Sequence, residues 1–205
     1  MDALLAKSLG KSMSYETYRE LVRQLAIDNS TSGLQKTESN IQFTKLNDRR
    51  MKRWDKTIEL SEETIERINS FQEKVTWLVI SESWCGDSAH INPVLNKIAQ
   101  INNNIDLRFV LRDENPELMD AFLTYGNRSI PKLIMIDDAS GKVLSTYGPR
   151  PSEATYFVNR FISKNGKLTP DFKEDLQHWY NKDKGKNILD DITEMLCETS
   201  SNFCL

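Results

Sequence analysis

The first third of the chain alternates apolar and polar residues with the period of amphipathic helices. One such stretch follows Ser14, a favourable N-cap residue. A second apolar face repeats along residues 43–58, and the basic side chains between residues 45 and 56 are expected to form its solvated face. A third helix is expected to begin at Ser61. These patterns predict a helical N-terminal extension over residues 1–73.

The middle of the chain changes to short apolar runs that alternate with helical patterns. The runs predict strands at residues 75–80, 105–111, 131–137 and 142–148, and the patterns between them predict helices at 87–100, 115–125 and 152–163. This order, β-α-β-α-β-β-α, predicts an α/β core at residues 74–165 in which helices flank a mixed sheet. Two more amphipathic patterns predict that residues 166–205 form a helical C-terminal extension packed on the core.

Length and charge narrow the class of protein. The 205 residues exceed one typical domain of about 100–150, which fits a single core with appended helices. With 27 basic and 30 acidic residues the net charge is −3, which argues against a nucleic-acid partner. No apolar run approaches the roughly 20 residues that span a bilayer, and the N-terminus lacks a secretory signal pattern. We therefore expect a cytoplasmic protein with no membrane partner.

The cysteine content directs attention to one free thiol. The chain contains 3 cysteines, Cys85, Cys197 and Cys204, too few for a disulfide framework or a four-cysteine zinc site. We expect no metal and no cofactor. In a reducing compartment an odd cysteine is either a small buried hydrophobic residue or a nucleophile. The two C-terminal cysteines are expected to be unrelated to it, unless the tail brings Cys204 to Cys85 as a resolving thiol.

Two motifs identify the chemistry of Cys85. The first predicted strand runs into SWCGDS at residues 83–88, and a helical pattern follows immediately. This segment resembles the active-site turn of thioredoxin-like proteins, and SIPKLI at residues 129–134 resembles the loop in which that family has a cis proline. The resemblance covers residues 75–163 and implies a thioredoxin-like fold with thiol-redox chemistry.

The resemblance also implies a role for each residue around the turn. At a helix N-terminus, unpaired N–H groups and the helix dipole favour a thiolate, which fits Cys85 as the nucleophile. Pro131, in the cis form, would present the backbone of Ile130 to a substrate. The remaining residues of the expected substrate site are Trp84, Gly86 and Asp87. His90 lies further around the predicted helix and is expected to be packed or solvated.

The chain departs from the family motif at three positions. Ser88 stands where thioredoxins have the resolving cysteine, so no dithiol–disulfide cycle can be confined to this turn. Asp87, taken as exposed, raises the pKa of the thiol, whereas a Ser88 hydroxyl donating to the thiolate lowers it more, so we expect a somewhat acidic Cys85. Val79 stands where many thioredoxins have a buried acid, and Glu82 is the candidate to replace it.

These observations predict a thioredoxin-like thiol-redox protein of monothiol type. Cys85 would form mixed disulfides and Ser88 would stabilise its thiolate, with protein disulfides or low-molecular-weight thiols of the glutathione type as partners. The alternative is a non-catalytic adapter that keeps the proline loop for binding. A third hypothesis is peroxide sensing through a sulfenic acid at Cys85. The sequence makes no prediction of the oligomeric state.

Overall fold

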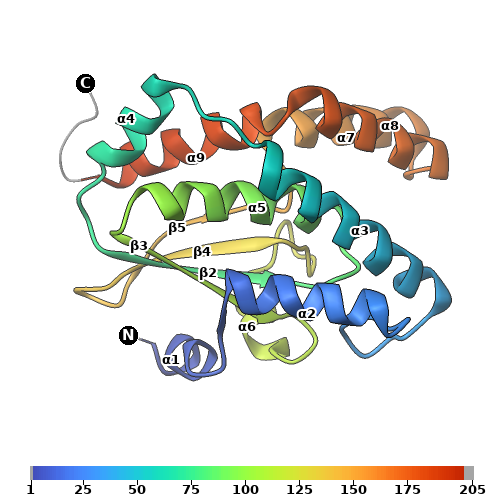
Figure 1. Cartoon of the computed structure of the whole chain (residues 1–205), viewed down its shortest axis with the longest axis horizontal. Coiled ribbons are helices and arrows are strands. Elements are labelled where there is room, and N and C mark those ends of the chain that lie inside the picture. Colours follow the sequence, from blue (N-terminus) through green and yellow to red (C-terminus); the bar gives the residue numbers. More distant parts are fainter. Residues whose placement is uncertain (1, 201–205) are drawn as a thin grey trace.

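A five-stranded mixed sheet forms the centre of the protein in a computed structural model that describes residues 2–200 (Figure 1). The strands lie side by side in the order β1-β3-β2-β4-β5. Only β2 and β3 run parallel to each other, and every other neighbouring pair is antiparallel. The strands are β1 (Met13–Ser14), β2 (Val75–Ser81), β3 (Ile105–Leu111), β4 (Lys132–Asp137) and β5 (Val143–Tyr147).

Helices cover both faces of the sheet. They are α1 (Ala3–Leu9), α2 (Tyr15–Ile27), α3 (Glu38–Thr57), α4 (Glu62–Ser70), α5 (Gly86–Ile101), α6 (Pro116–Ala121), α7 (Ser152–Asn165), α8 (Pro170–Asp183) and α9 (Lys186–Thr199). Side chains cap several of them as expected: Ser14 accepts from the Thr17 N–H, and Ser61 accepts from the Thr64 N–H. Within residues 2–200, no helix is long and apolar enough to cross a membrane.

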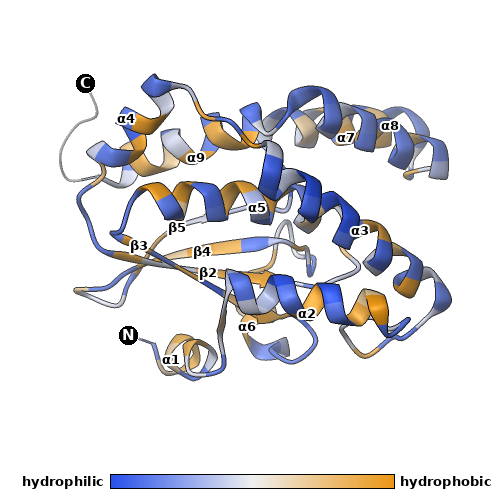
Figure 2. Cartoon of the chain, viewed as in Figure 1, coloured by the Kyte–Doolittle hydropathy of each residue, from blue (hydrophilic) through white to orange (hydrophobic). Residues whose placement is uncertain are grey.

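The two faces of the sheet carry separate hydrophobic cores because side chains alternate along each strand. On one face, Trp77 and Val79 of β2 pack with α2, α5 and α9. On the other face, Leu78 and Ile80 pack with Leu5 of α1 and with residues of α6. Figure 2 shows the resulting pattern, in which apolar strands lie between helices whose outer faces are polar. Since β2 is buried along its whole length, its C-terminal end delivers the next residues to a fixed place.

The α/β thioredoxin-like fold predicted from the sequence is confirmed, with four of the five strands within a residue or two of the predicted bounds. The N-terminal part is not wholly helical, however, because Met13 and Ser14 form β1 and pair antiparallel with β3. Two residues are too few to show a strand period. The helix expected at residues 115–125 ends at Ala121, and Tyr125 has a positive φ of 48° that no helix continues through.

Candidate active site

Cys85 lies between the end of β2 and the first residue of α5. It is a free thiol, its side chain is buried with 8% exposure, and its Sγ donates a hydrogen bond to the carbonyl oxygen of Ile130 at 3.3 Å. Cys85 is the N-cap residue of α5, and no side chain caps the helix there. The sulfur is therefore held between the positive end of a helix of 16 residues and the loop before β4.

The loop opposite the sulfur has the form that the resemblance implied. The Ile130–Pro131 peptide bond is cis, and a second cis bond, Gly148–Pro149, lies next to it. Gly148 has a φ of 101°, and a Cβ at this position would lie 2.2 Å from the carbonyl oxygen of Pro131. Only glycine permits this approach. The second loop carries Arg150 to the site, a contribution that the Gly-Pro pair could have signalled but that sequence reasoning missed.

A cavity of about 500 Å³ opens over Cys85, and we call it the cysteine pocket. It is lined by five of the residues expected at the site, namely Trp84, Cys85, Gly86, Asp87 and Ile130. The other two expected residues lie behind this lining: Ser88 is buried at 1% exposure, and Pro131 is also buried. The structure therefore brings all seven residues together, with two of them in supporting positions.

The flanking helices contribute walls of the cysteine pocket that the sequence did not indicate. Phe43 and Arg50 come from α3, and Leu176 and Gln177 come from α8. The expectation that the basic side chains of residues 45–56 form a solvated face is wrong for Arg50, which is half-buried against the site. Contacts of this kind join segments far apart in the chain, and no local pattern reports them.

The structure contradicts the expectation of a somewhat acidic Cys85. Burial, and after it the negative charge of Asp87, raise the pKa of the thiol to about 11. The hydroxyl and the backbone N–H of Ser88 lower the pKa, as does Arg150, but they do not offset burial. The expected directions are right, since Asp87 raises the pKa of Cys85 and Ser88 lowers it. The expectation left out desolvation of the sulfur, which is the larger effect.

Ser88 is positioned to act on the charged form of the sulfur. Among residues 2–200, its buried Oγ has no hydrogen-bond partner. A buried hydroxyl without a partner is destabilised, and a thiolate at Cys85 would give it an acceptor. The role proposed for Ser88 from the sequence fits this geometry and stays a prediction.

Asp87 is a largely covered carboxylate, its side chain 11% exposed, rather than the exposed one that was expected. Tyr180 of α8 donates its hydroxyl proton to Asp87 Oδ1 at 2.8 Å, and Arg150 Nε lies 3.0 Å from Oδ2. Burial raises the pKa of Asp87, while Arg150 and Tyr180 lower it. The carboxylate thus ties the active-site turn to the second proline loop and to the C-terminal extension.

His90 is packed, as expected, and it also joins α3 to α8. The Trp54 Nε1–H donates to its Nδ1 at 2.8 Å, and its Nε2 lies 2.8 Å from the Gln177 Oε1. Its ring stacks on Tyr180 with the centroids 4.3 Å apart. Because burial lowers the pKa of His90 to about 3, the ring is neutral, and its Nε2–H donates to Gln177. This bond leaves the Gln177 amide nitrogen free to face the active-site turn.

Glu82 is fully buried, and its carboxylate binds the loops around the turn. Its carboxylate accepts a short hydrogen bond from the Ser32 hydroxyl and another, at 2.9 Å, from the Asp113 N–H. Burial raises the pKa of Glu82. Since both partners belong to the loops around the turn, Glu82 holds these loops in place, and its role as a substitute for the family's buried acid stays a prediction.

The cysteine turn, its proline loop and the order of strands agree with a family comparison. The family model described as Thioredoxin matches residues 33–166. The chain belongs to the thioredoxin family. The match begins well before β2, so it includes α3, which supplies one wall of the cysteine pocket in this thioredoxin-family protein.

Solved structures agree on the fold of this thioredoxin-family protein. A protein of unknown function from Pseudomonas aeruginosa is similar over 74% of this chain and 84% of its own, with a TM-score of 0.59 and 16% identity. An HIV epitope scaffold is similar over 93% of this chain and 96% of its own, with a TM-score of 0.61 and 15% identity. At such identities the likeness concerns the fold alone. No curated protein matches the sequence.

The expectations about a metal, a cofactor and the tail cysteines remain predictions. Among residues 2–200, no group of three or more His, Cys, Asp or Glu side chains could hold a metal ion, and the expected absence of a cofactor has not been tested. Cys197 lies on α9 and is disulfide-bonded, and Cys204 lies outside the described residues. In this state Cys197 is not a free thiol, and the hypothesis that Cys204 resolves a mixed disulfide stays a prediction.

Proposed function

We propose that this protein carries out thiol–disulfide exchange through Cys85 as its single active-site thiol. The observation that carries the proposal is the Cys85 sulfur held 3.3 Å from the Ile130 carbonyl oxygen at the base of the cysteine pocket. A substrate disulfide that enters the pocket meets the sulfur beside backbone that can pair with it. The fold supports a thiol-redox role in general, and the monothiol mechanism is our proposal.

In the proposed reaction, the Cys85 thiol gives up its proton and the thiolate attacks one sulfur of a substrate disulfide. The substrate S–S bond breaks as the Cys85–substrate bond forms, and the leaving thiolate takes up a proton. An external low-molecular-weight thiol then attacks the mixed disulfide, regenerates the Cys85 thiol and leaves as a new disulfide. Ser88 would stabilise the thiolate formed in each half of the cycle.

The raised pKa of Cys85 makes the reactive thiolate scarce at neutral pH but strongly nucleophilic. Nucleophilic strength increases with thiol pKa, which offsets part of the lost thiolate population. We therefore expect a slow exchange that accelerates as the pH rises toward 11. We propose the cytoplasm as the site of the reaction, because its low-molecular-weight thiols would return the mixed disulfide to the free Cys85 thiol.

Mixing the protein with oxidised glutathione at pH 7.5 and pH 9 tests the proposal. We expect a mass increase of one glutathionyl group on the tryptic peptide of residues 75–97, whose single cysteine is Cys85, with faster formation at pH 9. The Cys85→Ala variant should lack this adduct. If that peptide stays unmodified while a small control thiol added to the same sample is modified, Cys85 does not carry out the reaction.

The raised pKa also favours a second candidate function, a non-catalytic adapter that uses the proline loop for binding. An adapter does not need a thiolate, and burial of Cys85 would then be ordinary packing. Capture of partners by wild type and by Cys85→Ala under non-reducing conditions separates the two functions. An adapter retains its partners in the variant, whereas covalent capture through Cys85 is lost.

A further inference from the structure

We propose that the cysteine pocket selects anionic disulfides, those of low-molecular-weight thiols that carry carboxylate or phosphate groups. This inference rests on the proposed exchange at Cys85 and names the substrate class of that site. Its starting observation is the charge of the lining. The cationic residues of the pocket are Arg50, Arg112, Arg128, Arg150 and Lys173, whereas Asp87 is the acidic residue among the lining side chains. The whole chain carries a net charge of −3, so this cationic cluster runs against the overall balance.

The clearest candidate to hold an anion is Arg50. The other three arginines have carboxylate partners, with Arg112 paired to Asp113, Arg128 to Asp120 and Arg150 to Asp87. Arg50 instead donates from Nη1 to the Asn47 amide oxygen at 2.9 Å, and within residues 2–200 no carboxylate forms an ion pair with it. Burial lowers the pKa of Arg50 to about 10. The charge of Asp87, which is itself paired with Arg150, offsets this effect only in part, so Arg50 is a partly buried cation that an anionic substrate group would stabilise.

Arg50 is also placed next to the reacting turn. A Cβ at Gly86, the residue after the nucleophile, would lie 3.6 Å from Arg50 Nη1 and 3.8 Å from Gln177 Nε2. Two N–H donor groups from different helices therefore converge beside Gly86, the residue that follows the nucleophile. The hydrogen bond between His90 and Gln177 fixes which end of the amide faces the turn. The absence of a side chain at Gly86 leaves space for a substrate group between these donors and Cys85.

The remaining features fit a small, charged substrate. The unpaired N–H groups at the start of α5 and its dipole favour negative charge at the same place. Arg112 lies over the Trp84 ring with its Cζ 4.8 Å from the centroid, which makes a flat wall of mixed apolar and cationic character. The volume of about 500 Å³ lies within the usual range of about 300–1,000 Å³ for small-molecule sites.

A comparison of disulfides of different charge tests the inference on the full chain. The substrates are oxidised glutathione with its carboxylates, coenzyme A disulfide with its phosphates, uncharged hydroxyethyl disulfide and cationic cystamine. We expect both anionic disulfides to modify Cys85 at least about tenfold faster than cystamine at low salt, and added salt to narrow the gap. A preference between the two anionic disulfides would show whether carboxylate or phosphate is the preferred group.

The Arg50→Gln variant tests the assigned residue. We expect it to slow the anionic disulfides about tenfold more than hydroxyethyl disulfide, because it removes a charge-assisted contact that only the anions make. Arg49→Gln is the matched control, since Arg49 is the exposed neighbour on the same helix and does not line the pocket. It should leave the relative rates of the four disulfides as they are in wild type.

The outcomes separate this inference from the proposed function. If all four disulfides modify Cys85 at similar rates, or Arg50→Gln slows each of them equally, selection of anions is overturned while exchange at Cys85 stands. If no disulfide modifies Cys85, exchange itself fails, and binding of unreactive S-methylglutathione then decides the inference alone. Binding of S-methylglutathione that Arg50→Gln weakens supports an anion site. No binding at a concentration of roughly 10 mM overturns the inference.

Discussion

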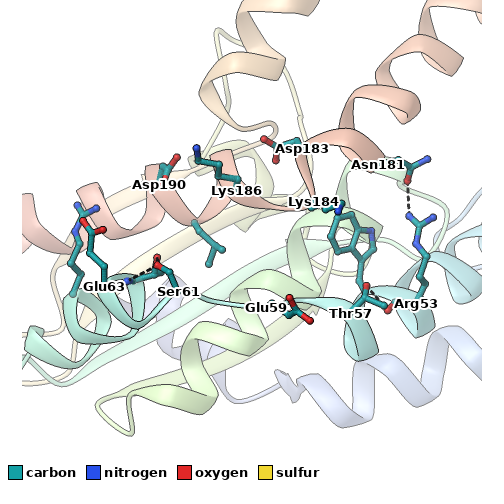
Figure 3. Close-up of a pocket in the computed structure, with 14 residues that line it drawn as sticks. Arg53, Thr57, Glu59, Ser61, Glu63, Asn181, Asp183, Lys184, Lys186 and Asp190 are labelled. Carbon is teal, nitrogen blue, oxygen red and sulfur yellow. Dashed lines mark hydrogen bonds between the residues drawn. The ribbon is translucent and has the colours of Figure 1, made fainter.

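Two cavities with different charges lie on either side of His90, which bonds Trp54 in the lining of one and Gln177 in the lining of the other. On one side is the cysteine pocket. On the other is a larger cavity of about 700 Å³ between α3, α4, α8 and α9, which we call the balanced pocket (Figure 3). Its cations are Arg53, Arg67, Lys184 and Lys186, and its acids are Glu59, Glu63, Asp183 and Asp190. The larger cavity thus carries both charges in equal number, while the smaller one carries an excess of cations and the free thiol.

The arrangement of charge, rather than the volume, distinguishes the cysteine pocket from the balanced pocket. Opposite charges that alternate over a short distance cancel in the field they project into solvent, whereas a cluster of one sign attracts ligands of the other. In the balanced pocket, Arg53 already donates to the Asn181 amide oxygen at 2.6 Å (Figure 3). Arg50, one helical turn earlier, makes a similar bond to the Asn47 amide oxygen at 2.9 Å, but the pocket that it lines has one acidic side chain, Asp87, where the balanced pocket has four.

Glycine substitutions should give the largest difference between the two regions. Gly148→Ala places a Cβ 2.2 Å from the Pro131 carbonyl oxygen, so we expect unfolding free energy to fall by about 4 kcal/mol. Near the balanced pocket, Gly185→Ala meets Val94 Cγ2 at 3.1 Å and should lose about 2 kcal/mol. Urea denaturation measures both losses.

Gly126→Ala is the control for these variants. Gly126 also has a positive φ, 75°, but a Cβ there meets nothing within 4 Å. It should lose only about 1 kcal/mol, the cost of the left-handed backbone alone. Equal losses at Gly148 and Gly126 would mean that the close approach of the two proline loops does not contribute to stability.

The free energy of unfolding should depend on pH through His90, which lies between the two pockets. Burial lowers the pKa of His90 to about 3, so the unfolded chain takes up this proton first as the pH falls below about 6.5. Unfolding free energy should therefore decrease by up to about 1.4 kcal/mol per pH unit between those values because of His90. Denaturation curves from pH 7 to pH 4.5 measure this slope.

A His90→Gln variant isolates the contribution of the imidazole from that of the carboxylates, which also titrate in this range. The variant is expected to be less stable at pH 7 but to depend less steeply on pH. The same slope in wild type and variant would show that His90 is not held neutral between Trp54 and Gln177.

The acidic residues of the two pockets should differ in their effect on the alkylation rate of Cys85, which is the smallest of the expected differences. The negative charge of Asp87 raises the pKa of Cys85, so Asp87→Asn should lower that pKa and increase the rate of Cys85 alkylation at pH 7.5 about tenfold. In wild type the rate should still be rising at pH 10, because the thiol titrates at about 11. Iodoacetamide labelling of the peptide of residues 75–97, followed over pH, measures both.

Asp190→Asn makes the same change in the balanced pocket. We expect no effect on alkylation of Cys85, because this carboxylate lines the balanced pocket and not the cysteine pocket. A comparable increase in both variants would point to a general loosening of the protein and not to the charge beside the sulfur.

Much of the fold was predictable because its signals are local. The caps at Ser14 and Ser61 and the fully apolar run of β2 act through neighbours a few residues away, so they can be identified from the chain itself. Strand β1 was missed because two residues are too few to show a period, whereas α1 falls within the part of the chain expected to be helical, although no separate helix was predicted there. The turn with Cys85 and the loop with Pro131 were found through their motifs.

The sequence by itself determined the central sheet, the helices around it and the single cysteine in a turn that lacks its usual partner. Only the tertiary structure decided the state of that cysteine. Its pKa depends on burial and on Asp87, and its pocket depends on side chains from α3, the second proline loop and α8. Desolvation and charge act through space over a few ångströms, and residues as distant in the chain as Arg50 and Gln177 become neighbours only when the chain has folded.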